Sequence, residues 1–186
     1  MVTDATDQTF EQDVIERSRE RPVVVDFWAE WCGPCRALGP VLEREVAATG
    51  GAVELVKVDT DANPNLALEY GIRSIPAVKA FRNGHVVSEF VGALPPERVR
   101  TFVGELTAPS ATERLLAEDG VTPGVRAALE RGDVEEALRL LLERVPDADA
   151  EERDRIREIA LGLFADLGPE HPTTLTYRRR LATALY

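Results

Sequence analysis

The chain has 186 residues, of which 44% are hydrophobic, and its formal net charge at pH 7 is −11. This length allows either one large domain or two small ones, and this composition can fill a buried core. The negative charge disfavours nucleic acid and anionic membranes as partners.

The first 107 residues alternate between helical and extended patterns. In chain order they predict a helix at 9–18, a strand at 22–29, a helix at 35–51, a strand at 53–61, a helix at 64–72, two strands within 76–92 and a helix at 95–106. The run VVVDFWA lacks polar alternation, which is typical of a central strand buried on both faces. Asn83-Gly84 is a strong hairpin signal. Strands separated by helices favour a parallel core with an antiparallel hairpin at one edge.

After residue 107 the strand patterns stop. The rest of the sequence predicts five helices, at 112–120, 123–132, 133–145, 151–168 and 172–186. The fourth is the clearest, because its apolar residues from Ile156 to Leu167 form one continuous stripe. We therefore expect two domains, 1–107 and 113–186, joined by a linker at 108–112.

The N-terminal stretch MVTDATDQTFEQDVIERS is acidic and polar, and it lacks the apolar core of a signal peptide. No apolar run approaches the roughly 20 residues that cross a bilayer. We therefore expect a cytoplasmic protein with no membrane partner. Thiols stay reduced in the cytosol, so the close pair Cys32 and Cys35 is expected to be catalytic or metal-binding rather than structural.

The two cysteines lie in WCGPC, between a predicted buried strand and the start of a helix. The free N–H groups and the dipole of a helix N-terminus favour an anion, so the pKa of the Cys32 thiol should fall below its usual range. Cys35, one turn further, is within reach of a mixed disulfide on Cys32, as thiol–disulfide exchange requires. Gly33 lets a partner chain approach closely, and Pro34 stiffens the turn.

Asp26 is a carboxylate inside a predicted buried strand, where burial should raise its pKa. If its side chain points at the cysteines, it can act as a general base for Cys35. Lys57, in the neighbouring strand, could reach it and reduce the cost of burial. The alternative is an Asp–Lys pair that serves only packing.

Pro76 begins a predicted strand in RSIPAV. An X–Pro bond at this position can be cis, an uncommon form that is usually functional. It can equally be an ordinary trans proline at a strand edge.

Together, VVVDFWAEWCGPCRALGPVLE, VKVDTDANPNLALEYGIRSIPAV and FRNGHVV resemble the thioredoxin family over about residues 5–107. The resemblance implies a thioredoxin fold in which Cys32 attacks a substrate disulfide, Cys35 resolves it and Asp26 shuttles the proton. It implies no bound cofactor, only a redox-active Cys32–Cys35 disulfide that a thioredoxin reductase recycles. The implied substrate-binding residues are Trp31, Gly33, Pro34, Ile75 and cis-Pro76, and the supporting residues are Trp28, Lys57 and Pro40, which should kink its helix.

A zinc site would need both cysteines together with His85 and His171. His85 follows a predicted hairpin turn and His171 lies in the other predicted domain, so we expect no metal. A Cys–His hydrolase lacks partners for the same reason and leaves the second cysteine unexplained.

The stretch GDVEEALRLLLERVPDA has the pattern of the second helix of a tetratricopeptide repeat, which cannot bury its apolar face alone. The closing stretch, EIALGLFADLGPEHPTTLTYRRRLATALY, resembles the end of thioredoxin–tetratricopeptide fusions called chaperedoxins. In that family the helical repeats hold unfolding clients and deliver them to chaperones, including the chaperonin. This tail is shorter than those of the longer members, and both cysteines are present.

The C-terminal helix is the better candidate for binding a partner, because Arg178, Arg179 and Arg180 interrupt an acidic surface near Tyr186. The alternative is an ordinary solvated helix face.

The whole pattern predicts an α/β thioredoxin fold followed by an all-α, tetratricopeptide-like module. We expect a monomeric, cytoplasmic protein disulfide reductase that also acts as a co-chaperone or adaptor through its tail. Its partners would be proteins with disulfides or unfolding segments, a thioredoxin reductase, and the chaperonin or other chaperones. Two alternatives remain open: a redox-silent holdase or binding module that uses the thioredoxin fold for recognition, and an ordinary thioredoxin with a stabilising tail.

Overall fold

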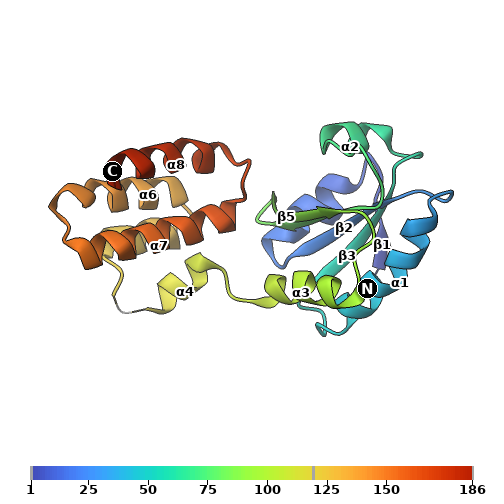
Figure 1. The fold of residues 1–186 in the computed structure, drawn as a ribbon, viewed down its shortest axis with the longest axis horizontal. Helices are drawn as coiled ribbons and strands as arrows, with labels where there is room; N and C mark the ends of the chain where they lie inside the picture. Colours follow the sequence, from blue (N-terminus) through green and yellow to red (C-terminus); the bar gives the residue numbers. More distant parts are fainter. Residues whose placement is uncertain (1, 119, 186) are drawn as a thin grey trace. The chain divides into compact units, whose positions relative to one another are not determined.

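The chain divides into two compact units, Met1–Ala108 and Pro109–Tyr186 (Figure 1). The structure, a computed structural model, describes residues 2–118 and 120–185. Each unit encloses an apolar core of its own.

A mixed sheet forms the centre of the first unit. Its strands among the described residues are β1 (Val2–Asp4), β2 (Val23–Trp28), β3 (Glu54–Asp59), β4 (Ala77–Arg82) and β5 (His85–Val91), in the spatial order β1-β3-β2-β4-β5. The first three strands run parallel to one another, whereas β4 is antiparallel to both β2 and β5. The predicted parallel core with an antiparallel hairpin at one edge is therefore confirmed.

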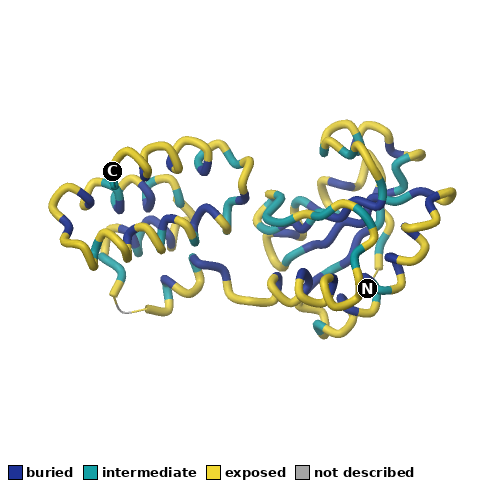
Figure 2. The backbone as a smooth tube through the Cα atoms, viewed as in Figure 1, coloured by how far each residue is buried: buried dark blue, intermediate teal, exposed yellow. Residues whose placement is uncertain are grey.

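Helices cover both faces of this sheet (Figure 1). On one face, α1 (Gly33–Ala47) and α3 (Pro96–Thr107) pack on a core that includes Val24 of β2. On the other face, the short segments η1 (Glu11–Glu16) and α2 (Pro64–Glu69) contribute to a core that includes Val23, Val25 and Phe27 of β2. All of β2 from Val23 to Phe27 is buried, as the absence of polar alternation predicted (Figure 2).

The turn between β4 and β5 follows the chemistry that Asn83-Gly84 predicted. Both residues have positive φ, 53° and 82°, which is the combination that a type I′ hairpin turn requires. Ser18 holds this turn from outside, because its carbonyl oxygen accepts from the Asn83 N–H at 2.7 Å and its hydroxyl accepts from the Gly84 N–H at 2.8 Å.

The N-terminal segment differs from the expectation in two ways. Strand β1 lies in a stretch that was predicted only as polar chain, and it pairs with β3. The helix expected at 9–18 consists of η1, which is π-helical, and η2 (Arg17–Arg19), which is a 3₁₀ turn.

The described residues of the second unit fold into helices. These are α4 (Ala111–Ala117), α5 (Pro123–Glu130), α6 (Val134–Glu143), the 3₁₀ turn η3 (Val145–Asp147), α7 (Ala150–Leu167) and α8 (Pro172–Leu185). The predicted stripe on α7 faces the core, where Ile156, Ala160, Leu163 and Phe164 are buried (Figure 2). No helix in the described part of the chain is long and apolar enough to cross a membrane.

The segment predicted as a linker, 108–112, contains the start of α4. Ser110 and Glu113 form a capping box, in which the Ser110 hydroxyl accepts from the Glu113 N–H at 3.0 Å and Glu113 accepts from the Ser110 N–H at 2.6 Å. The Asp166 carboxylate of α7 accepts from the first two backbone N–H groups of α4, at 2.9 and 2.8 Å. Residues 110–112 are therefore fixed on the second unit.

Candidate active site

The two cysteines form a disulfide at the N-terminus of α1, with an S–S distance of 2.06 Å and a Cα–Cα distance of 5.3 Å. Cys32 is the N-cap of α1, and its Sγ accepts a hydrogen bond from the Cys35 backbone N–H at 3.2 Å. Backbone donors and the positive end of the helix dipole stabilise an anion at this position. The Cys32 sulfur therefore lies where a thiolate is favoured once the bond is reduced.

Apolar side chains pack against the disulfide. Each cysteine is 3% exposed, and both belong to a small apolar cluster with Ala29. Trp28 and Ile75 pack against that cluster from its edge. The disulfide is therefore largely shielded from solvent.

Three of the predicted substrate-binding residues, Trp31, Gly33 and Pro34, are close to Cys32 in the chain and are exposed. Trp31 is 68% exposed, and its indole N–H donates to the Asp61 carboxylate at 2.8 Å, which fixes the ring. A Cβ at Gly33 would meet only the Arg36 guanidinium, at 4.0 Å, so the space above this turn is open. An extended chain can approach the backbone closely here.

The Ile75–Pro76 peptide bond is cis, which decides between the two possibilities that the sequence left open. Pro76 is buried, and its carbonyl oxygen accepts from the Gly92 N–H at 2.8 Å. Since Ile75 packs on the cysteine cluster, this segment lies next to the disulfide.

Asp26 is buried in the middle of β2, with 1% of its surface exposed. Neither of its carboxylate oxygens has a hydrogen-bond partner among the described residues. Burial raises the pKa of Asp26 to about 6, the Lys57 charge works against this rise, and the Glu43 charge adds to it. A carboxyl group with such a pKa can both accept and release a proton near neutral pH.

Lys57 is the register partner of Asp26 across β2 and β3, as expected. Its ammonium group nevertheless makes its ion pair with Glu43, at 3.5 Å, and lies 4.9 Å from the centre of the Trp28 ring. The sequence reasoning missed Glu43. The signal that could have found it is the spacing Cys35, Gly39, Glu43, which places all three on one side of α1.

The remaining predicted residues that the structure describes belong to α1 and to α8, and none of them is part of the apolar cluster around the cysteines. Pro40 is exposed within α1, which continues through it from Gly33 to Ala47. On α8 of the second unit, Arg178 lies 5.9 Å from the Phe164 ring, and Arg180 lies 4.9 Å from the Tyr177 ring. Tyr186 lies outside the described residues.

The part of the chain that the structure describes contains no group of three or more histidine, cysteine, aspartate or glutamate residues that could hold a metal ion. His85 begins β5 in the first unit, and His171 precedes α8 in the second. These two residues thus belong to separate units.

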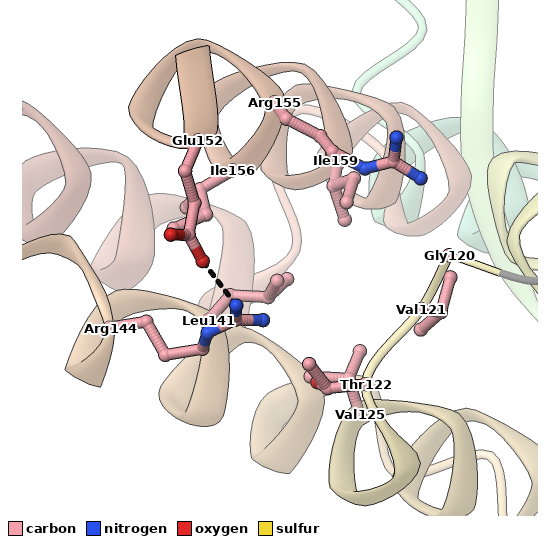
Figure 3. Close-up of a pocket in the computed structure, with 10 residues that line it drawn as sticks. All are labelled: Gly120, Val121, Thr122, Val125, Leu141, Arg144, Glu152, Arg155, Ile156 and Ile159. Carbon is pink, nitrogen blue, oxygen red and sulfur yellow. Dashed lines mark hydrogen bonds and ion pairs between the residues drawn. The ribbon is translucent and has the colours of Figure 1, made fainter. Parts of the chain in front are cut away.

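The second unit has a small hollow between α5, α6 and α7 (Figure 3). Val125, Leu141 and Ile156 are among its apolar lining residues, and an Arg144–Glu152 ion pair lies at its edge. Its volume is about 60 Å³, whereas ligand pockets usually enclose roughly 300–1,000 Å³. The hollow is therefore too small for a cofactor.

Comparison with known proteins adds independent information. The thioredoxin family model matches residues 1–105, and a model described as a tetratricopeptide repeat matches residues 125–186. Thioredoxin of Streptomyces clavuligerus is 48% identical over 95 residues, which cover 51% of this chain and 86% of that protein. Thioredoxin 1 of Synechococcus elongatus is 51% identical over 90 residues, which cover 48% of this chain and 82% of that protein.

Among solved structures, the thioredoxin of Malassezia sympodialis superposes with a TM-score of 0.52 at 35% identity, covering 57% of this chain and 94% of that one. These matches confirm the predicted thioredoxin fold and its fusion to a tetratricopeptide-like region. The narrower resemblance to chaperedoxins stays a prediction.

Proposed function

The chain belongs to the thioredoxin family and is a protein disulfide reductase, and we propose that its helical tail also makes it an adaptor that selects or hands on protein clients. The observation that supports the chemistry best is the hydrogen bond from the Cys35 N–H to the Cys32 Sγ at the start of α1. The stabilised sulfur belongs to a residue that lies in the chain between the exposed residues Trp31 and Gly33.

In the proposed reaction, the reduced Cys32 thiolate attacks one sulfur of a substrate disulfide. A mixed disulfide forms, and the other substrate sulfur leaves as a thiolate that takes up a proton. Cys35 then attacks the Cys32 sulfur, the second substrate sulfur leaves, and the Cys32–Cys35 disulfide is restored. Two electrons pass from the dithiol to the substrate, and a thioredoxin reductase returns them.

Asp26 is the proposed base for Cys35. Its burial, the lack of a hydrogen-bond partner for its oxygens among the described residues, and its raised pKa of about 6 support this role, because such a carboxyl group accepts a proton more readily than an ordinary aspartate. Trp31, Gly33, Pro34, Ile75 and Pro76 are proposed to bind the substrate chain, with the exposed turn at 33–34 giving access for its backbone.

For the tail we favour an adaptor over a holdase. A holdase needs a broad exposed apolar surface. In the described part of the tail, the large apolar side chains with substantial exposure are Leu161 and Leu175, at 50% and 46%. Recognition of folded partners by a tetratricopeptide-like surface fits this composition better. We place this activity in the cytoplasm, where the dithiol would be kept reduced.

The chemistry is tested by reduction of a disulfide-bonded protein, coupled to NADPH and a thioredoxin reductase. Full-length protein and the first unit alone, 1–108, are expected to turn over, whereas Cys32→Ser is expected to fall to the uncatalysed rate. Turnover by Cys32→Ser equal to that of the unmodified protein would refute the reductase mechanism.

The adaptor role is tested by trapping. Cys35→Ser leaves Cys32 able to form mixed disulfides that cannot be resolved, so clients remain attached and can be identified by mass spectrometry. If the tail selects clients, full-length Cys35→Ser and 1–108 Cys35→Ser will trap different sets. Identical sets would leave the tail as a stabilising appendage of an ordinary thioredoxin.

A further inference from the structure

Glu43 is connected to Asp26 through Lys57. Asp26 and Lys57 are register partners on adjacent parallel strands, so their side chains leave the same face of the sheet. This is the face on which Val24, Leu55 and helix α1 meet. Glu43 lies on α1, and its carboxylate pairs with the Lys57 ammonium group at 3.5 Å.

The contacts that hold the Lys57 ammonium group do not include the Asp26 carboxylate. Besides Glu43, the group lies 4.9 Å from the centre of the Trp28 ring, and a Cβ built at Gly39 would be 3.8 Å from it. Both Asp26 oxygens lack a hydrogen-bond partner in the described part of the chain. Lys57 thus acts on Asp26 through space, and the position of its ammonium group decides how strongly.

We propose that Glu43 is a positioning residue for the proton transfer, because it draws the Lys57 ammonium group away from Asp26 and so helps the Asp26 carboxyl group to hold a proton. This inference rests on the proposed role of Asp26 as the base for Cys35. Glu43 touches neither the substrate nor the sulfur atoms in this scheme, and it acts through Lys57.

The direct and the indirect effect of Glu43 both raise the pKa of Asp26. Its own negative charge favours the neutral form of Asp26, and so does its hold on the nearest cation. On the opposite neighbour strand, β4, the register partner of Asp26 is the apolar residue Val78. Lys57 and Glu43 are the charged groups whose fields shift the pKa of Asp26, and they do so in opposite directions. Removal of Glu43 should therefore make Asp26 a stronger acid.

The first test is a titration of the Asp26 carboxyl carbon by NMR in the oxidised full-length protein, in which the cysteines carry no titrating proton. Glu43→Gln is expected to lower the Asp26 midpoint by about half a pH unit or more. The matched control is Glu105→Gln, which removes the same charge from an exposed position of α3. An unchanged midpoint in Glu43→Gln, or an equal fall in Glu105→Gln, would overturn the proposal.

The second test asks whether Glu43 acts through Lys57. Lys57→Gln should raise the Asp26 midpoint, and adding Glu43→Gln to it should then shift the midpoint less than half as far as in the unmodified background. Such non-additivity is the signature of a shared partner. Equal shifts in both backgrounds would show direct action of Glu43 and would overturn the indirect route.

The third test connects the titration to the reaction. The pH profile for release of the second substrate thiol should move to lower pH in Glu43→Gln, in step with the Asp26 midpoint. If the midpoint falls and the profile does not move, Asp26 is not the base of Cys35, and the catalytic part of this proposal falls with it. The turnover of Cys32→Ser separately reports whether the reductase chemistry itself holds.

Discussion

Gly162 of α7 lies directly against Ala111, the first residue of α4, so that a Cβ built at position 162 would come within 2.8 Å of the Ala111 Cβ. Carbon atoms in favourable contact are about 3.5–4.0 Å apart. The same end of α4 is fixed to α7 by the Asp166 carboxylate. The close packing of α4 on α7 therefore depends on glycine, which has no side chain, at position 162.

Gly162→Ala is expected to destabilise the tail. Alanine gains about 1 kcal/mol over glycine within a helix, whereas overpacking costs about 1–3 kcal/mol, so the free energy of unfolding of the tail should fall by about 1 kcal/mol. Denaturation followed by circular dichroism measures this change. The control is Gly104→Ala in α3, where a Cβ would meet nothing within 4 Å, and which should stabilise the first unit by about 0.5–1 kcal/mol. A tail stabilised by Gly162→Ala would contradict the close approach.

Asp26→Asn is expected to stabilise the first unit at neutral pH. The pKa of Asp26 is raised from 3.8 to about 6, so between these values the folded state binds more protons than the unfolded state. Stability is therefore lost as the pH rises through this window, and the full loss, on the order of 3 kcal/mol, is reached above pH 6 or so. Asp26→Asn has no carboxyl group to ionise, so its free energy of unfolding does not fall with pH in this way.

This expectation is tested by urea unfolding at several pH values, followed by tryptophan fluorescence, since Trp28 and Trp31 both lie in the first unit. The advantage of Asp26→Asn should vanish below about pH 4, where both proteins carry a neutral group. A difference that is constant with pH would assign the effect to packing instead of charge.

Arg82→Ala should loosen the end of the first unit. The Arg82 guanidinium donates to the carbonyl oxygens of Leu106 and Ala108, at 2.7 and 3.2 Å, and so caps the C-terminus of α3. Loss of these bonds should cost about 1–2 kcal/mol and speed proteolysis near residue 108. Arg98→Ala, at an exposed position of the same helix, should leave the cleavage rate unchanged.

After reduction, Cys32 should react with an alkylating reagent at least about ten times faster than Cys35 at neutral pH. Its sulfur lies at the N-cap of α1 and accepts the Cys35 N–H, whereas Cys35 lies inside the first turn. Peptide mapping after brief exposure to iodoacetamide measures the ratio. Equal labelling of the two thiols would argue against a stabilised Cys32 thiolate.

Local signals in the sequence predicted most of the fold. The unalternating strand β2, the Asn83-Gly84 turn and the stripe on α7 each depend on neighbours close in sequence, so their patterns were sufficient. Strand β1 was missed because it has only three residues and is defined by its pairing with β3, which lies about fifty residues away.

The active site followed the same division: features carried by neighbouring residues were predictable, and contacts between distant residues were not. The cysteine motif and the buried Asp26 were visible in the sequence because each carries its own chemical signal. The partner of Lys57 was not, because the spacing along α1 places Glu43 on the side of Cys35 but does not show which group the Lys57 ammonium contacts. The three-dimensional arrangement shows that Glu43 of α1 and the Trp28 ring of β2 hold it. The start of α4 was predicted to within one residue, but its contact with Asp166 was not, since that residue lies on a helix about 55 residues away.

The position of the Cys32–Cys35 pair in the first unit also determines how the tail responds to oxidants. Apart from Met1, these two residues carry all the sulfur in the chain, so residues 109–186 contain neither cysteine nor methionine. Oxidants that act on protein sulfur can therefore damage or switch the first unit while the covalent chemistry of the tail stays the same. A response of the tail to such oxidants must therefore originate in the sulfur chemistry of the first unit.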